Sequence, residues 1–182
     1  MRIDVKIPYS ENEDLAEAYN RALEESTADW VLFLDHDVFL CNPKWYDMCL
    51  AAIKTLEVDP KAACVGCACG GEHHKRTMEG EGVPTSLLDT YIAESISRYH
   101  EFGNMLQKKH RHTTGYFLLL NRAIALATGF RQIKKSVNNI DKDFGNRLIK
   151  GGYNIYHMPG LYIYHRRGMR HLRKDFKIQG ND

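Results

Sequence analysis

The sequence predicts one α/β domain with a mainly parallel sheet, on three observations. Residues 30–34 (WVLFL) are apolar on both faces and too short for a helix, which is typical of a buried strand in a parallel sheet. Segments of strand and helix character alternate along the 182 residues, as a sheet covered by helices requires. One helix face is marked by apolar residues at helical spacing: Leu15, Ala18, Tyr19, Ala22 and Leu23.

Helix-start signals follow the first two expected strands. Ile3–Ile7 alternates as a short strand that ends at a proline. Ser10 begins a capping-box spacing, which predicts a helix over about 13–26. After the second strand, Asn42 is expected as the N-cap of another helix, with the following proline as its first residue.

The middle of the chain is expected to continue the alternation. Ala62–Cys69 is interpreted as a third strand, and the Gly-rich, polar residues 70–86 as a loop. Apolar periodicity predicts a long helix over about 87–109. Tyr116–Leu120 is the next expected strand, and a short helix follows it to about Thr128.

The last third is expected to hold one helix and two strands. A polar loop runs to Ile140, and a helix over about 142–150 stops at a pair of glycines. Residues 154–157 and 161–165 are expected as the final strands. Because α/β sheets bind ligands at the carboxyl ends of their strands, polar residues that follow strands are the candidates for a site.

Composition narrows the class of protein. Net charge is +2, and the longest strictly apolar run, Met48–Ile53, has six residues, so no transmembrane segment is expected. The N-terminus has no signal-peptide core and the five cysteines form no secreted framework, which favours a cytoplasmic setting. The domain is expected over 1–168 and a basic tail over 169–182. The basic residues from 166 onward suit a phosphate group, nucleic acid or an acidic surface, or are simply solvated.

Two acids directly follow the buried strand at 30–34. Asp35 and Asp37 would lie on the same side if the strand continued. Carboxylate oxygens are the ligands that hard divalent cations prefer, and such cations pair with substrate phosphates. The pattern therefore predicts a divalent-cation site, with an acidic turn as the alternative.

Two later groups are candidates for the same chemistry. Asp141 is either a helix N-cap or a general base at the rim of the sheet. Asp143 lies about 200° around the helix from it, so at most one of the two faces a given site. His165 ends the last strand, and a metal there with a diphosphate at Arg166 or Arg167 would make one consistent site.

A cysteine and histidine cluster allows a different interpretation. Its spacing resembles a zinc ligand set, but the usual second ligand pair is missing. The cysteines also fit a buried strand, which we favour. The cluster consists of Cys64, Cys67, Cys69, His73 and His74.

Several motifs, in order, resemble the GT-A fold glycosyltransferases, family two in particular. The match covers most of residues 1–168 and ends with Pro159 and the strand that reaches His165. The parts of the chain that resemble the family's motifs are residues 14–23 and 29–37, then residues 114–122 and 128–130, and then residues 141–148 and 151–153.

The resemblance implies a Rossmann-like, three-layer α/β/α fold and a hexosyltransferase-type reaction. A nucleoside-diphosphate sugar of the UDP or GDP type would be the donor, a glycan or other hydroxyl group the acceptor, and Mn²⁺ or Mg²⁺ the cofactor. Asp37 would hold the metal with His165, and Asp35 would contact the ribose or a metal-bound water. Asp141 would act as the base with inversion, and Asp143 is the next candidate. No nucleic-acid partner is implied.

The resemblance also places residues around the donor. Thr114 and Gly115 match positions that contact the donor sugar. Pro8 and Tyr9 follow the first strand, where the nucleotide lies in the family. The remaining donor-binding candidates are His36, Arg166 and Arg167.

The sequence departs from the family pattern in its first half. A further strand–helix–strand segment normally precedes the helix at 13–26, and the acid usually before the base is here Ile140. The alternatives are therefore a non-catalytic or degenerate GT-A binding module, or another metal-dependent phosphate enzyme such as a nucleotidyltransferase or phosphoesterase. A zinc-stabilised nucleic-acid module is the remaining one.

Overall fold

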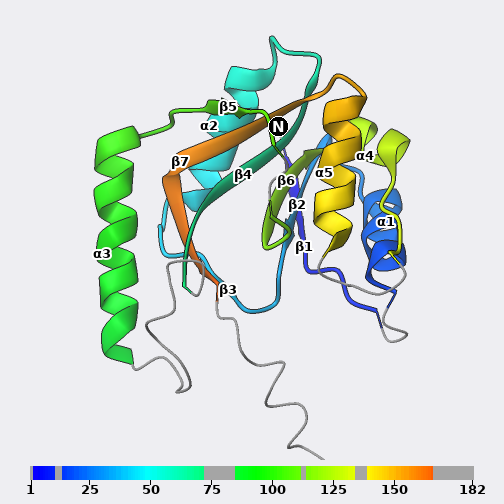
Figure 1. Cartoon of the computed structure of the whole chain (residues 1–182). Coiled ribbons are helices and arrows are strands. Elements are labelled where there is room, and N and C mark those ends of the chain that lie inside the picture. Colours follow the sequence, from blue (N-terminus) through cyan, green and yellow to red (C-terminus); the bar gives the residue numbers. More distant parts are fainter. Residues whose placement is uncertain (1, 11–13, 72–84, 112–113, 134–138, 166–182) are drawn as a thin grey trace, which may run out of the picture.

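A computed structural model describes residues 2–10, 14–71, 85–111, 114–133 and 139–165 (Figure 1). The candidates His73, His74, Arg166 and Arg167 and the expected tail at 169–182 lie outside these ranges. The strands are β1 (Ile3–Lys6), β2 (Trp30–Leu34), β3 (Val38–Phe39), β4 (Ala62–Gly71), β5 (Gln107–Lys109), β6 (Phe117–Asn121) and β7 (Asn154–His165). The helices are α1 (Leu15–Glu25), α2 (Trp45–Leu56), α3 (Thr85–Phe102), α4 (Arg122–Thr128) and α5 (Ile140–Lys150).

All the strands belong to one sheet of order β1-β2-β6-β4-β7-β3, with β5 paired to β7. The strands β1, β2, β4 and β7 run in one direction, which confirms the predicted α/β fold and its mainly parallel strands. β6 lies antiparallel between β2 and β4. The four co-directional strands therefore end on one side, the lower one in Figure 1, which we call the carboxyl-end edge.

Helices cover both faces of the sheet, as the three-layer expectation requires. Val31 and Phe33 face a core shared with α1, α4 and α5, while Leu32 and its alternate neighbours face a core shared with α2. This alternation explains why every residue of β2 is apolar. No helix in the described ranges is both long and apolar enough to span a bilayer.

Two helices begin later than the sequence predicts. The N-cap of α1 is Asp14, whose carboxylate accepts a hydrogen bond from the Glu17 N–H at 2.9 Å, so the expected capping box at Ser10 is wrong. Asn42 does not cap α2, because its side-chain oxygen accepts from the Lys44 N–H at 2.9 Å in a preceding turn. A local turn of this kind competes with helix capping by the same side chain.

The helix expected over 87–109 ends at Phe102 instead. Gly103 takes a φ of +52°, a conformation that glycine adopts without steric cost, and the chain then forms β5 against β7. The backbone of Gly103 also lies close to that of Gly160 in β7, because a Cβ at Gly160 would lie 2.2 Å from the Gly103 carbonyl oxygen. Long-range pairing with β7 therefore overrides the helical periodicity of this segment.

The last two expected strands form one strand, β7. Its pairing with β4 shifts register twice, first between Ala62 and Cys64, and again where Cys67 faces Met158 and the next residue, Ala68, faces Tyr162. Pro159 lies in the skipped part, where a residue without an N–H donor disturbs the ladder least. The short strand β3, which pairs with the end of β7, was not predicted.

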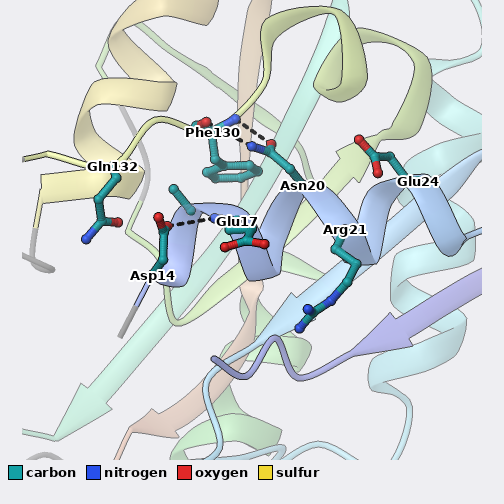
Figure 2. A pocket seen from close by; sticks show the side chains of 8 residues that line it. Asp14, Glu17, Asn20, Arg21, Glu24, Phe130 and Gln132 are labelled. Carbon is teal, nitrogen blue, oxygen red and sulfur yellow. Dashed lines mark hydrogen bonds between the residues drawn. The ribbon is translucent and has the colours of Figure 1, made fainter. Parts of the chain in front are cut away.

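Polar contacts connect α1 and α5 to the turn after α4, and Figure 2 shows the one between Asn20 of α1 and Phe130. Asn20 donates to the Phe130 carbonyl at 3.0 Å and accepts from the Phe130 N–H at 2.7 Å. Arg147 pairs with Asp143 at 2.8 Å and donates to the carbonyls of Thr128 and Gly129. We call Asn20, Phe130, Asp143 and Arg147 the polar clasp, which connects α1 and α5 to the turn after α4.

Candidate active site

The three predicted metal ligands, Asp35, Asp37 and His165, converge at the carboxyl-end edge. His165 Nε2 lies 3.0 Å from Asp37 Oδ1 and 3.3 Å from Asp35 Oδ2. The side chains are 11%, 18% and 35% exposed, in the order His165, Asp37, Asp35. Pairing of Val38 with His165 across β3 and β7 brings the end of one strand to the acids that follow another.

The acids reach His165 through a turn and not through a continued strand. β2 ends at Leu34, and the Val38 N–H donates to the Asp35 carbonyl at 3.3 Å. The strand alternation that would place Asp35 and Asp37 on the same side therefore does not apply at this turn. Both carboxylates still approach the imidazole of His165. His36 is exposed at the turn.

The geometry of these ligand atoms fits a divalent cation. One atom from each of the three residues lies within 4.8 Å of the others. Adjacent ligands around a six-coordinate ion with bonds of about 2.1 Å lie roughly 3 Å apart, as the His165 contacts do. In the described part of the chain the buried His165 Nδ1 has no hydrogen-bond partner, so the ring is oriented by its Nε2 contacts and by Tyr116, 5.5 Å away between ring centroids.

Asp141 lies in the first turn of α5, and its carboxylate is bound by the backbone just before β6. The Gly115 N–H donates to Asp141 Oδ2 at 2.7 Å. The N-cap position belongs to Asn139, so the N-cap alternative for Asp141 is wrong. A Cβ on Gly115 would lie 3.3 Å from Asp141 Cβ, which explains why the small residue suits this position.

Contacts connect Asp141 to the metal-ligand cluster. Tyr116, next to Gly115, accepts a hydrogen bond from the Asp35 N–H at 3.2 Å through its carbonyl. The hydroxyl of Tyr19 has a raised pKa because it is buried and because the Asp35 and Asp141 carboxylates lie near it. Asp35, Asp37, His165 and Asp141 therefore share one edge of the sheet, and the neutral Tyr19 hydroxyl lies near two of the carboxylates.

Asp143 occupies a different environment. Its carboxylate is 32% exposed and pairs with Arg147, which also holds the carbonyls after α4. As the angular separation from Asp141 predicts, the two carboxylates therefore have different contacts. Asp143 belongs to the polar clasp.

The predicted donor-binding residues lie at or near the same edge. The parallel register of Lys6 with Phe33 brings Pro8 and Tyr9 alongside the end of β2. Tyr9 is 68% exposed, and its carbonyl accepts from Arg21 at 3.3 Å. Thr114 is half-buried beside Gly115.

The hollow in Figure 2 lies on the outer side of α1 and contains none of these residues. It measures about 380 Å³, and Asn20, Arg21, Glu24 and Gln132 are among its lining. Asn20 already serves the polar clasp, and Asp14, also in the lining, caps α1. Two polar residues that line this hollow therefore already have structural roles.

Sequence reasoning missed two tyrosines of the site. Tyr19 was assigned to the apolar face of its helix and Tyr116 to a strand, and both are indeed packed against the core. Their hydroxyl groups and their positions near Asn20 and Gly115 of the recognised motifs were the available signal. Only the fold shows that their rings lie against the charged cluster.

The cysteines are part of the core, as the favoured interpretation has it. Cys64 and Cys67 are buried in β4, and burial raises the pKa of both thiols. Zinc binds the thiolate, which such burial disfavours. Within the described ranges, the group suited to a metal is Asp35, Asp37 and His165.

Comparison with known proteins agrees with this arrangement. The chain matches glycosyl transferase family 2 over residues 3–129. No curated protein matches it significantly. A solved structure with similar fold is the mannosyltransferase PcManGT from Pyrobaculum calidifontis in complex with GDP-Man and Mn²⁺, at a TM-score of 0.51 and 19% identity. The alignment covers 87% of this chain but only 39% of that protein. With its GT-A fold and a family match over most of its length, the chain belongs to glycosyl transferase family 2.

Proposed function

We propose that the chain transfers a sugar, a hexose, from a nucleoside-diphosphate sugar to an acceptor hydroxyl, with inversion and with a divalent cation. One observation carries the proposal: Asp35, Asp37, His165 and Asp141 meet at one edge of the sheet. Family membership supports glycosyl transfer as the reaction class.

Asp37 and His165 would hold the cation, together with Asp35. When bound, the cation would neutralise the charge that develops on the leaving nucleoside diphosphate. Two carboxylates with an imidazole nitrogen favour Mn²⁺ over Mg²⁺, since imidazole suits the transition metals better. The mannosyltransferase with the similar fold also contains Mn²⁺.

Asp141 would remove the proton from the acceptor hydroxyl. The Gly115 N–H binds Oδ2 and thereby orients the carboxylate, which leaves Oδ1 to accept the proton. The hydroxyl oxygen would attack the anomeric carbon from the side opposite the leaving diphosphate, so the configuration inverts. Tyr19, uncharged beside Asp35 and Asp141, adds no negative charge between the two.

Donor binding would begin at the end of β1. Pro8 and Tyr9, which follow β1, would contact the nucleotide, and Thr114 and Gly115 would contact the sugar. Because the similar mannosyltransferase was solved with GDP-Man, GDP is the first nucleotide to test.

The first experiment is thermal unfolding with UDP, GDP, CDP or ADP, each with Mn²⁺ and with EDTA. A ligand at 100 times its Kd stabilises the fold by about 2.7 kcal/mol, which raises Tm by several degrees. We expect a shift with one diphosphate that requires Mn²⁺. No shift with any of them would favour a non-catalytic module.

Variants then separate binding from turnover. Asp37→Ala should abolish the Mn²⁺-dependent shift, whereas Asp141→Asn should keep the shift and lower turnover about 10³-fold. The exposed Asp47→Asn on α2 is the matched control and should leave both unchanged. Release of pyrophosphate or phosphate in place of a nucleoside diphosphate would instead indicate another phosphate enzyme.

A further inference from the structure

A second hollow, of about 360 Å³, lies beside the described residues between β5 and β6, residues 110–111 and 114–116, where the chain passes from one side of β7 and β4 to the other. The crossing follows from topology, since β5 pairs with the outer edge of β7 while β6 pairs with β4 on the other side. Lining side chains come from this crossing and from β7. They include Lys109, Arg111, Thr114, Tyr116, Tyr156 and His157.

The lining is positively charged. Lys109 and Arg111 contribute two cations, and the described residues that line the hollow include no carboxylate. Lys109 donates to the neutral Gln107 side chain at 2.8 Å, and no carboxylate in the described ranges forms an ion pair with Lys109 or Arg111. Their charge therefore remains available to a ligand.

His157 adds a neutral hydrogen-bonding group to this hollow. Burial and the nearby cations Lys109, Arg98 and Arg111 lower its pKa to about 4. At neutral pH the ring therefore offers one N–H donor and one acceptor without charge. A lining of two cations with neutral donors is typical of a site for an oxyanion.

The hollow adjoins the proposed catalytic base. Thr114 and Tyr116 line it, and Gly115 between them holds Asp141 through its N–H at 2.7 Å. The Tyr116 ring also lies 5.5 Å from the His165 ring, between centroids. An acceptor whose hydroxyl contacts Asp141 would therefore lie close to the hollow, because Gly115, which binds Asp141, stands between two residues that line the hollow.

We propose that this hollow is an acceptor subsite that binds an anionic group, phosphate or carboxylate, through Lys109 and Arg111. The inference rests on the proposed function, because it assigns the hydroxyl at Asp141 to the acceptor. It predicts that the acceptor is an acidic sugar or a phosphorylated molecule.

The test starts from binding by the full chain in EDTA without nucleotide, so that the donor site plays no part. Inorganic phosphate and glucuronate are titrated separately and followed by backbone amide NMR shifts of residues that line the hollow. We expect saturable binding of at least one probe, weakened at least tenfold by Lys109→Gln with Arg111→Gln. Lys108→Gln is the matched control, because Lys108 is the exposed neighbour on β5 and does not line the hollow.

Transfer assays then use methyl glucoside, its 6-phosphate and methyl glucuronide as acceptors. The double variant should raise KM at least tenfold for the preferred anionic acceptor and leave KM for the donor and for methyl glucoside unchanged. The better of the two anionic acceptors identifies phosphate or carboxylate as the ligand group.

The two proposals fail in different ways. Equal anion binding by the double variant and the Lys108→Gln control overturns the subsite, even if sugar transfer is observed. An unchanged KM for the anionic acceptors overturns its acceptor role. Lysine-dependent anion binding without any nucleotide binding or transfer would instead refute the proposed function and support the anion site.

Discussion

Asp141 and Asp143 are two residues apart in the same helix turn and have opposite surroundings. Asp141 accepts one backbone hydrogen bond, from Gly115, and lies near the metal-ligand cluster at the carboxyl-end edge. Asp143 is paired with Arg147, which is itself bound to two carbonyls of the turn after α4. The comparison shows that two acids of one motif can have different partners, and we use these partners to tell the proposed base from the residue that holds the turn after α4.

The same difference holds for the two regions as a whole. In the polar clasp, hydrogen-bonding groups satisfy one another across α1, α4 and α5. At the carboxyl-end edge, carboxylates lie close together around one imidazole, an arrangement that a cation would stabilise. Variants of the clasp should therefore lower stability, and variants of the edge should change ligand binding.

The largest effect on stability is expected for Arg147→Ala. The change leaves the carbonyls of Thr128 and Gly129 without their donors and Asp143 without its partner, at a cost of about 3 kcal/mol in the free energy of unfolding. Urea unfolding measures this loss in the free energy of unfolding. The control is Arg131→Ala at an exposed position, whose free energy of unfolding should stay within about 0.5 kcal/mol of the unchanged protein. Equal stability of the two variants would contradict the role of the clasp.

A smaller loss is expected for Asn20→Ala. Both backbone groups of Phe130 lose their partner, and hydrogen bonds of this kind contribute about 1 kcal/mol each, so the loss is about 2 kcal/mol. Urea unfolding of the double variant with Arg147→Ala tests whether the clasp is one unit. Strictly additive losses would indicate two independent contacts.

A pH effect is expected from Asp4, a structural acid on β1. Hydrogen bonds from Ser26 and Arg2 lower the pKa of this carboxyl to about 2, below its ordinary value of 3.8. The stabilisation is therefore full above about pH 4 and is lost as pH falls toward 2. Because Arg2 is exposed, we expect only about 1 kcal/mol, and Asp4→Asn should flatten the acid limb of the unfolding curve by that amount.

The smallest effect on stability is expected for Asp37→Asn. The substitution keeps the shape of the side chain and removes one of two neighbouring negative charges, so metal-free stability should change by less than about 1 kcal/mol. The Mn²⁺-dependent rise in Tm should nevertheless disappear. A loss of stability as large as that of Arg147→Ala would mean that the edge, too, is mainly structural.

Most of the core elements could be predicted from the sequence because their signals are local. The continuous apolar run at 30–34 and the helical spacing in α1 each reflect burial against the chain's own sheet. Other predictions were wrong because a distant segment decided the outcome. The end of α3, for example, depends on the close approach of Gly103 to Gly160 and on pairing of β5 with β7.

The candidate site, like the fold, could be predicted only in part from the sequence. The sequence alone determined the residue types: two acids after a buried strand, an acid at the start of α5 and a histidine at the end of the last strand. Only the tertiary structure decided that β3 pairs with β7 and so brings Asp37 to His165, and that Gly115, not a helix cap, binds Asp141. The physical reason is that strand periodicity fixes which face a side chain takes, whereas proximity across the sheet depends on strand order and register, which no local pattern encodes.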